Sequence, residues 1–197
     1  MVVENNLHII RLFDYLAMDG GVQFFESVAN SFISKNADVE GFFREKSVQA
    51  TKLNTATTYL VISYENKKFD FLGYFTLATK ILTLKQSSLS KTECKATARF
   101  GYFDEDSQSY KLPAVLIAQF SRNFNESSKS ISGDDLMDIA LNKIRDILHS
   151  TSGKANPILP FCGSCKKNPP EGGLYVCFFI YVIAEFSELD YTWRVYL

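Results

Sequence analysis

A polar stretch ahead of an amphipathic segment is the part of this sequence best suited to binding an anion. Residues 121–133 read SRNFNESSKSISG and lie between an apolar run that ends at Phe120 and a helical pattern that begins near Asp134. A strand followed by a polar loop and a helix start exposes backbone N–H groups that have no partner within the helix. These groups and the helix dipole favour a negatively charged ligand. We therefore predict an anion-binding loop here.

The cysteine pair and the two histidines are weaker candidates for a functional site. Cys162 and Cys165 have the spacing of a zinc or redox pair, but Cys94 and Cys177 supply no second pair for a four-ligand zinc site. A redox motif of this kind lies at a strand-to-helix junction, whereas a Pro-rich segment follows Cys165. The chain has two histidines and no Gly-x-Ser-x-Gly elbow, which disfavours a hydrolase triad. We predict two loop thiols and no metal site.

Hydrophobic periodicity predicts the elements that must position the anion-binding loop. Apolar residues recur at helical spacing over residues 22–33 and 134–149, and Asp38 is a suitable N-cap for a helix through about Lys52. Ser132 and Asp135 have the form of a capping box at the start of the 134–149 helix. The polar sequence ENKK predicts a hairpin turn. Apolar and β-branched runs predict strands at residues 8–13, 57–64, 69–84, 96–102, 112–120, 174–184 and 191–197.

The order of these elements defines the fold class. Helices come first, then a meander of strands, and then a strand, the loop, a helix and a further strand. This order predicts a mixed α/β (α+β) domain with a central, mostly antiparallel sheet, one parallel crossover and flanking helices. No repeat or linker divides the chain. Residues 1–197 are therefore predicted to form a single domain, with a divergent C-terminal part from about residue 154.

Composition limits the classes of protein to which the chain can belong. The 197 residues include 21 Lys+Arg, 22 Asp+Glu, 17 Phe and 46% hydrophobic residues, enough to fold into a packed core rather than stay disordered. The net charge of −1 excludes a globally basic nucleic-acid coat. The most apolar run, residues 174–184, is shorter than the roughly 20 residues of a membrane span. No secretory signal is visible at the start, so we predict a cytoplasmic location without a membrane partner.

Four blocks of the sequence occur in an order and spacing typical of one superfamily. They are residues 32–52 (FISKNADVEGFFREKSVQATK), residues 57–80 with the block GYFTLATK at their end, residues 112–123 (LPAVLIAQFSRN) and residues 131–144 (ISGDDLMDIALNKI). Together they resemble the GCN5-related N-acetyltransferase (GNAT) superfamily, especially its small bacterial members, which include acetyltransferase toxins. The resemblance implies a GNAT-like sheet and acetyl-CoA-dependent transfer of an acetyl group to a primary amine. The acceptor could be a small molecule, a protein or an aminoacyl-tRNA.

The resemblance also implies which residues bind acetyl-CoA. The strand that ends near Phe120 would hold the coenzyme with its backbone, and a backbone N–H would polarise the acetyl carbonyl. The pyrophosphate loop of the superfamily reads Gln/Arg-x-x-Gly-x-Gly/Ala. Its second glycine corresponds to Gly133, while Ser128 and Ile131 stand at the Gln/Arg and first-glycine positions and depart from the pattern. The predicted cofactor-binding residues are Phe120, Ser121, Arg122, Ser128, Ile131, Ser132, Gly133 and Asp134.

Tyr191 is the predicted catalytic residue. In the superfamily a tyrosine on the last helix, a short helix that follows a strand, commonly protonates the departing thiolate as a general acid. Tyr191 follows Gly172-Gly173 and the 174–184 strand at a similar distance, although residues 155–170 form an insertion before them. From the residues alone, a packing aromatic is the stronger of the two interpretations of Tyr191.

A basic stretch bears on the partners of the protein. Between residues 67 and 99, seven cationic residues accompany Asp70 and Glu93. A solvated face is the favoured interpretation, and a patch that attracts the phosphates of a tRNA is the alternative. The resemblance adds an antitoxin protein and a second copy of the chain as candidate partners. The rival to an enzyme is a non-catalytic GNAT-fold binding module that has lost its activity through the altered loop and tail. The cationic residues are Lys67, Lys68, Lys80, Lys85, Lys91, Lys95 and Arg99.

Overall fold

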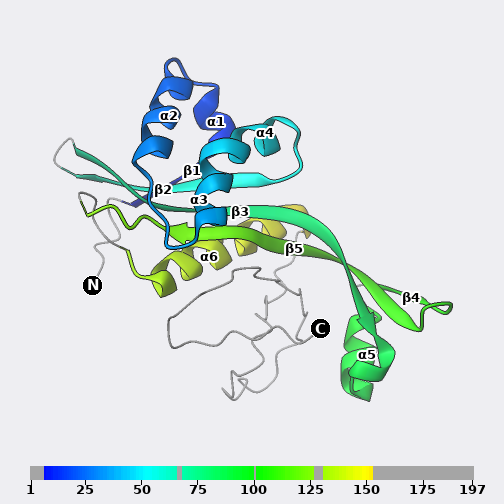
Figure 1. Ribbon diagram of the computed structural model, residues 1–197. Coiled ribbons are helices and arrows are strands. Elements are labelled where there is room, and N and C mark those ends of the chain that lie inside the picture. The colour runs from blue at the N-terminus through cyan, green and yellow to red at the C-terminus, as the bar shows by residue number, and fades with distance from the viewer. Residues whose placement is uncertain (1–6, 66–67, 100, 127–130, 153–197) are drawn as a thin grey trace. The chain divides into compact units, whose positions relative to one another are not determined.

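The computed structural model describes residues 7–65, 68–99, 101–126 and 131–152 (Figure 1). These residues fall into two compact units, one with residues 7–78 and 117–140 and the other with residues 79–116 and 141–152. The predicted strands at 174–184 and 191–197, and with them the parallel crossover, lie outside the described residues. That the whole chain forms a single domain stays a prediction.

The described strands form one sheet in the order β1-β2-β3-β5-β4. The sheet is antiparallel and helices accompany it, which confirms the predicted fold class. β2 and β3 form a hairpin in which Glu65 is paired with Lys68, where the sequence ENKK predicts the turn. The strands are β1 (Leu7–Arg11), β2 (Thr57–Glu65), β3 (Lys68–Lys85), β4 (Tyr102–Asp104) and β5 (Ser109–Arg122).

A layer of short helices covers one face of the sheet in the first unit (Figure 1). Between this layer and the sheet lies an aromatic core, in which Phe32, Phe43 and Tyr74 are fully buried. The rings of Phe43 and Tyr74 stack with their centroids 4.4 Å apart. This packing fixes the helices on β3. The helices are α1 (Leu12–Leu16), α2 (Gly21–Ser31), α3 (Ala37–Gly41) and α4 (Ser47–Lys52), with a π-helical turn at Phe42–Lys46 between the last two.

Two N-terminal predictions are wrong in detail. The strand predicted over residues 8–13 stops at Arg11, because Leu12 is fully buried as the first residue of α1. Asn36 replaces Asp38 as the N-cap of α3, and its Oδ1 accepts the backbone N–H groups of Asp38 and Val39 at 2.8 and 3.3 Å. Asparagine and aspartate cap helices about equally well, so composition could not choose between these near neighbours.

The second unit contains the remaining parts of β3 and β5, a 3-10 turn at Gln86–Ser88, α5 (Lys91–Thr97) and β4. The strand predicted over residues 96–102 is wrong. Ser90 and Glu93 form a capping box, with the Glu93 N–H on the Ser90 hydroxyl and the Ser90 N–H on the Glu93 carboxylate. This cap starts a helix that continues to Thr97, so β4 begins only at Tyr102.

Helix α6 (Gly133–Ser152) confirms the predicted amphipathic helix after the loop. Leu136, Ala140 and Ile144 are fully buried and form the apolar stripe predicted from the sequence. Within the first unit, the part of α6 up to Ala140 lies on the face of the sheet opposite the α1–α4 layer (Figure 1). The end of β5 is therefore followed by the loop and by a helix whose orientation is fixed by its buried stripe.

Candidate functional site

The end of β5 leads into the loop for which anion binding is predicted. Phe120 and Ser121 are buried there, whereas Arg122 is half-buried. The Ser121 hydroxyl is engaged within the protein, because it donates to the Arg122 carbonyl at 2.8 Å and lies 3.0 Å from the Ser34 hydroxyl. Of these three side chains, that of Arg122 is therefore the most accessible to a ligand.

The two edges of β5 have different neighbours. One edge lies beside β3, and on the other β4 pairs with Ser109–Lys111. Beyond Lys111, the described part of the chain contains no further strand on that edge. A ligand or an additional strand can thus lie beside the C-terminal part of β5.

Gly73 on β3 allows β3, β5 and α6 to approach closely at this point. A Cβ atom at Gly73 would lie 2.6 Å from the Ser121 carbonyl oxygen, 2.8 Å from the Arg122 Cα and 3.2 Å from a methyl group of Leu136. The first two contacts are with backbone, which cannot turn aside as a flexible side chain can. The absence of a side chain at Gly73 therefore sets the position of the end of β5.

We expect Gly73→Ala to lower the free energy of unfolding by roughly 1–3 kcal/mol, as overpacking in a tight core does. Gly41→Ala is the matched control, because a Cβ at Gly41 meets nothing within 4 Å and its φ of −61° suits any residue. This control should be neutral or slightly stabilising. Urea unfolding of both variants measures the difference. Equal unfolding midpoints for the two variants would refute a close approach at Gly73.

The connection between α2 and α3 is tied to the end of β5 (Figure 1). The Ile33 N–H donates to Asn123 Oδ1 at 3.2 Å, and the Phe124 N–H donates to the Ile33 carbonyl at 2.9 Å. The contact between the Ser34 and Ser121 hydroxyls joins the same two segments. These hydrogen bonds hold residues 33–35 against residues 121–124 at the end of β5.

Ser132 caps the start of α6 as predicted, but the Asp135 carboxylate accepts the Ser132 hydroxyl and not its backbone N–H as in a full capping box. The Asp135 N–H donates to the Ser132 hydroxyl at 3.0 Å, and this hydroxyl donates to the Asp135 carboxylate at 2.6 Å. Ile131 is buried, whereas Ser132, Gly133 and Asp134 are exposed. A Cβ atom at Gly133 would meet no described residue within 4 Å, so the described part of the chain leaves the space in front of this residue open.

The structure brings the predicted strand residues and loop residues together. Arg122 Nη1 donates to the Ile131 carbonyl at 3.2 Å and so joins the end of β5 to the residue just before α6. Ser128 and Tyr191 lie outside the described residues.

Some residues that shape the site were not predicted. Gly73 interrupts an apolar strand, and a glycine within a strand often marks a close backbone approach, so that signal was available. Ser34 and Asn123 could not be predicted from the local sequence, because each contacts residues far away in the sequence.

Gln119 lies on β5 with a buried Oε1 that has no hydrogen-bond partner in the described structure. An unsatisfied amide oxygen at this position suits an N–H donor.

Tyr74 is the buried tyrosine of the β3 core and does not suit the role of a general acid. Its hydroxyl donates to the Val39 carbonyl at 2.7 Å, and its side chain is fully buried. Burial also raises the pKa of Tyr74. This tyrosine is therefore a structural hydrogen-bond donor within the core.

Solved structures show which fold this arrangement belongs to. The chain is similar to a Tyr-to-Phe variant of KacT, with 16% identity, a TM-score of 0.51 and alignment over 75% of this chain and 74% of KacT. It is also similar to AtaT complexed with acetyl-methionyl-tRNAfMet, with 17% identity, a TM-score of 0.50 and alignment over 73% of this chain and 71% of AtaT. KacT and AtaT are GNAT-fold acetyltransferase toxins. The chain has the GNAT fold, as its sequence predicts.

No protein-family model matches the chain, and no curated protein matches it by sequence. Within the described residues, no helix has the length and apolar character needed to cross a membrane.

Proposed function

We propose that this chain is an acetyl-CoA-dependent N-acetyltransferase. The observation that carries the proposal is the geometry at the end of β5. The strand leads through a loop to the capped start of α6, and the space in front of Gly133 is open. Unpaired N–H groups at a helix start suit a pyrophosphate, and the open space lets such a group approach the backbone. The GNAT fold shared with KacT and AtaT supports this assignment.

Each group of residues in the chain would have its own role in the reaction. The backbone of Phe120, Ser121 and Arg122 would hold the coenzyme and present an N–H to the acetyl carbonyl. Residues 131–134 would hold its pyrophosphate. Acetyl-CoA, when bound, would supply the acetyl group, and Tyr191 would donate the proton that the departing sulfur takes up.

Calorimetric titration with acetyl-CoA tests the proposal, and a thiol-release assay with a mixture of amines complements it. We expect saturable binding with one coenzyme per chain, and release of thiol that depends on an amine. The rival function, a GNAT-fold binding module without catalysis, predicts no binding of acetyl-CoA. A well-folded chain that does not bind it would thus support the rival.

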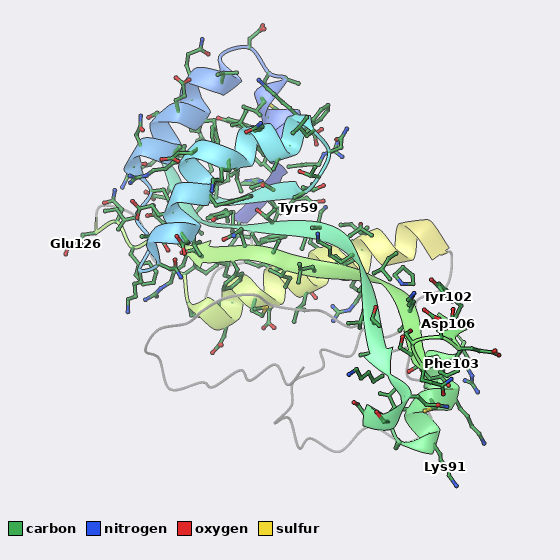
Figure 2. The ribbon with its side chains drawn as sticks, turned by 45° about the vertical axis from the view of Figure 1, so that its right-hand side comes forward. Tyr59, Lys91, Tyr102, Phe103, Asp106 and Glu126 are labelled. Atoms are coloured by element: carbon green, nitrogen blue, oxygen red, sulfur yellow. The ribbon has the colours of Figure 1, made fainter. Side chains whose placement is uncertain are left out.

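The acceptor class that the surface charges favour is a charged tRNA. The AtaT structure is a complex with acetyl-methionyl-tRNAfMet. In the second unit of this chain, Lys80, Lys85 and Lys91 are exposed, and none forms an ion pair with a described residue. Figure 2 shows Lys91 pointing outward from α5. Unpaired exposed lysines can contact phosphates with little loss of other interactions. An antitoxin partner and a homodimer stay predictions.

Replacing Lys80, Lys85 and Lys91 together by Gln should lower activity on a charged tRNA roughly tenfold or more at physiological salt. Each lysine that contacts a phosphate should also reduce the slope of log affinity against log salt concentration by about one. Lys46→Gln with Lys52→Gln is the control, because both lysines are exposed in the first unit. Activity and binding are measured between low and high salt. A slope equal to that of the parent would identify the three lysines as a solvated face.

A further inference from the structure

Two cationic side chains from distant parts of the sequence converge on one aromatic ring at the end of β5. The Arg122 guanidinium carbon lies 4.4 Å from the centroid of the Phe124 ring, and Lys35 Nζ lies 5.2 Å from the same centroid. Lys35 comes from the α2–α3 connection, whereas Arg122 and Phe124 come from the strand exit. The three residues belong to the same compact unit.

The backbone around this cluster is held in place. Phe124 donates its N–H to Ile33, two residues before Lys35. The Ser34 hydroxyl, next to Lys35, contacts the Ser121 hydroxyl, next to Arg122. The backbone positions from which the Lys35 and Arg122 side chains extend are therefore set by the fold.

No carboxylate neutralises these two cations in the described structure. The ion pairs found there join other residues, and neither Lys35 nor Arg122 takes part in one. Because both cations lie close to one ring, they are within roughly 10 Å of each other, a little more than the screening length of about 8 Å at physiological salt. A phosphate group that reaches both side chains would form charge-assisted hydrogen bonds with each of them.

At the Gln/Arg position of the superfamily pattern the predicted pyrophosphate loop has Ser128, and the cationic residues within 121–133 are Arg122 and Lys129. Within this loop, the Arg122 side chain donates to the Ile131 carbonyl just before α6. We propose that Lys35 and Arg122 bind a phosphate group of coenzyme A and supply positive charge at the end of β5. This inference rests on the proposed function, since it requires that coenzyme A binds at the end of β5.

Calorimetry with coenzyme A tests the proposal on Lys35→Gln, on Arg122→Gln and on the double variant. Each single variant should bind coenzyme A several-fold more weakly than the parent, and the double variant on the order of tenfold or more. Lys46→Gln is the matched control, because Lys46 is an exposed lysine of the same unit, and it should bind as the parent does. Lys35 makes no hydrogen bond with its side chain in the described structure, so Lys35→Gln should fold normally even if Arg122→Gln disturbs the loop.

Coenzyme A analogues separate the phosphate groups. If the variants lose the same factor with dephospho-coenzyme A, the cations bind the pyrophosphate. If the loss disappears with dephospho-coenzyme A, they bind the 3′-phosphate. Pantetheine has no phosphate, and its binding should be the same in parent and variants. Equal weakening with pantetheine would mean a structural role and overturn the proposal.

The failure of this inference is distinct from the failure of the proposed function. A parent chain that does not bind coenzyme A would refute the proposed function. A parent chain that binds it, together with a Lys35→Gln variant that binds it equally well, would refute the phosphate site of Lys35 and Arg122 and leave the proposed function standing.

Discussion

Gly133→Val is expected to weaken the binding of coenzyme A on the order of a hundredfold while the fold stays intact. The first helical residue of α6 has open space where its side chain would be. A pyrophosphate bound to the backbone N–H groups at this helix start would occupy that space, and the branched side chain of valine would displace it. A hundredfold change corresponds to about 2.8 kcal/mol of binding free energy. Calorimetry with coenzyme A measures it.

Two comparisons separate this effect from a change in the fold. Gly133→Ala adds one methyl group in the same place and should weaken binding less than valine does. Thermal unfolding of both variants should stay close to that of the parent, since neither side chain meets another group in the described structure. Unchanged affinity in a folded Gly133→Val variant would remove this loop from the coenzyme site.

The elements with a strong local pattern were predictable from the sequence. The stripe of Leu136, Ala140 and Ile144 defined α6, and its burial is the physical reason that the pattern exists. The β2–β3 hairpin was equally clear, because a polar turn separates two apolar runs. The resemblance to the GNAT superfamily made the fold predictable, because this resemblance depends on the order of such elements rather than on one motif.

Short elements were not predictable in the same way. Residues 96–102 carry enough β-branched and aromatic character to suggest a strand, but the cap formed by Ser90 and Glu93 starts a helix before them. Once α5 has begun, its hydrogen bonds extend it to Thr97 regardless of the strand propensity of the residues that follow. The capping-box spacing was present in the sequence and was the signal that should have decided the element.

The contacts that complete the candidate site lie beyond any local pattern. Ser34 meets Ser121 across 87 positions of sequence, and Ile33 meets Asn123 across 90. The same pairing sets Lys35 near Phe124, so the proposed phosphate site exists only in the folded chain. Side chains that the tertiary structure brings together can therefore replace residues that a sequence motif lacks. The motif alone does not include all the residues that can bind the ligand.

Tyr191→Phe is expected to lower kcat by roughly 10²–10⁴-fold, the range for removal of a general acid, with little change in the affinity for acetyl-CoA. The phenyl ring keeps the shape and the apolar surface of tyrosine but has no proton to give to the departing thiolate. Tyr191 lies outside the described residues, so turnover is the measurement that decides its role.

Tyr196→Phe is the matched control for this prediction, since it makes the same chemical change five residues later in the chain. Its kcat should equal that of the parent. If Tyr191→Phe turns over as fast as Tyr196→Phe, Tyr191 is a packing aromatic, and proton transfer to the sulfur falls to water or to another residue.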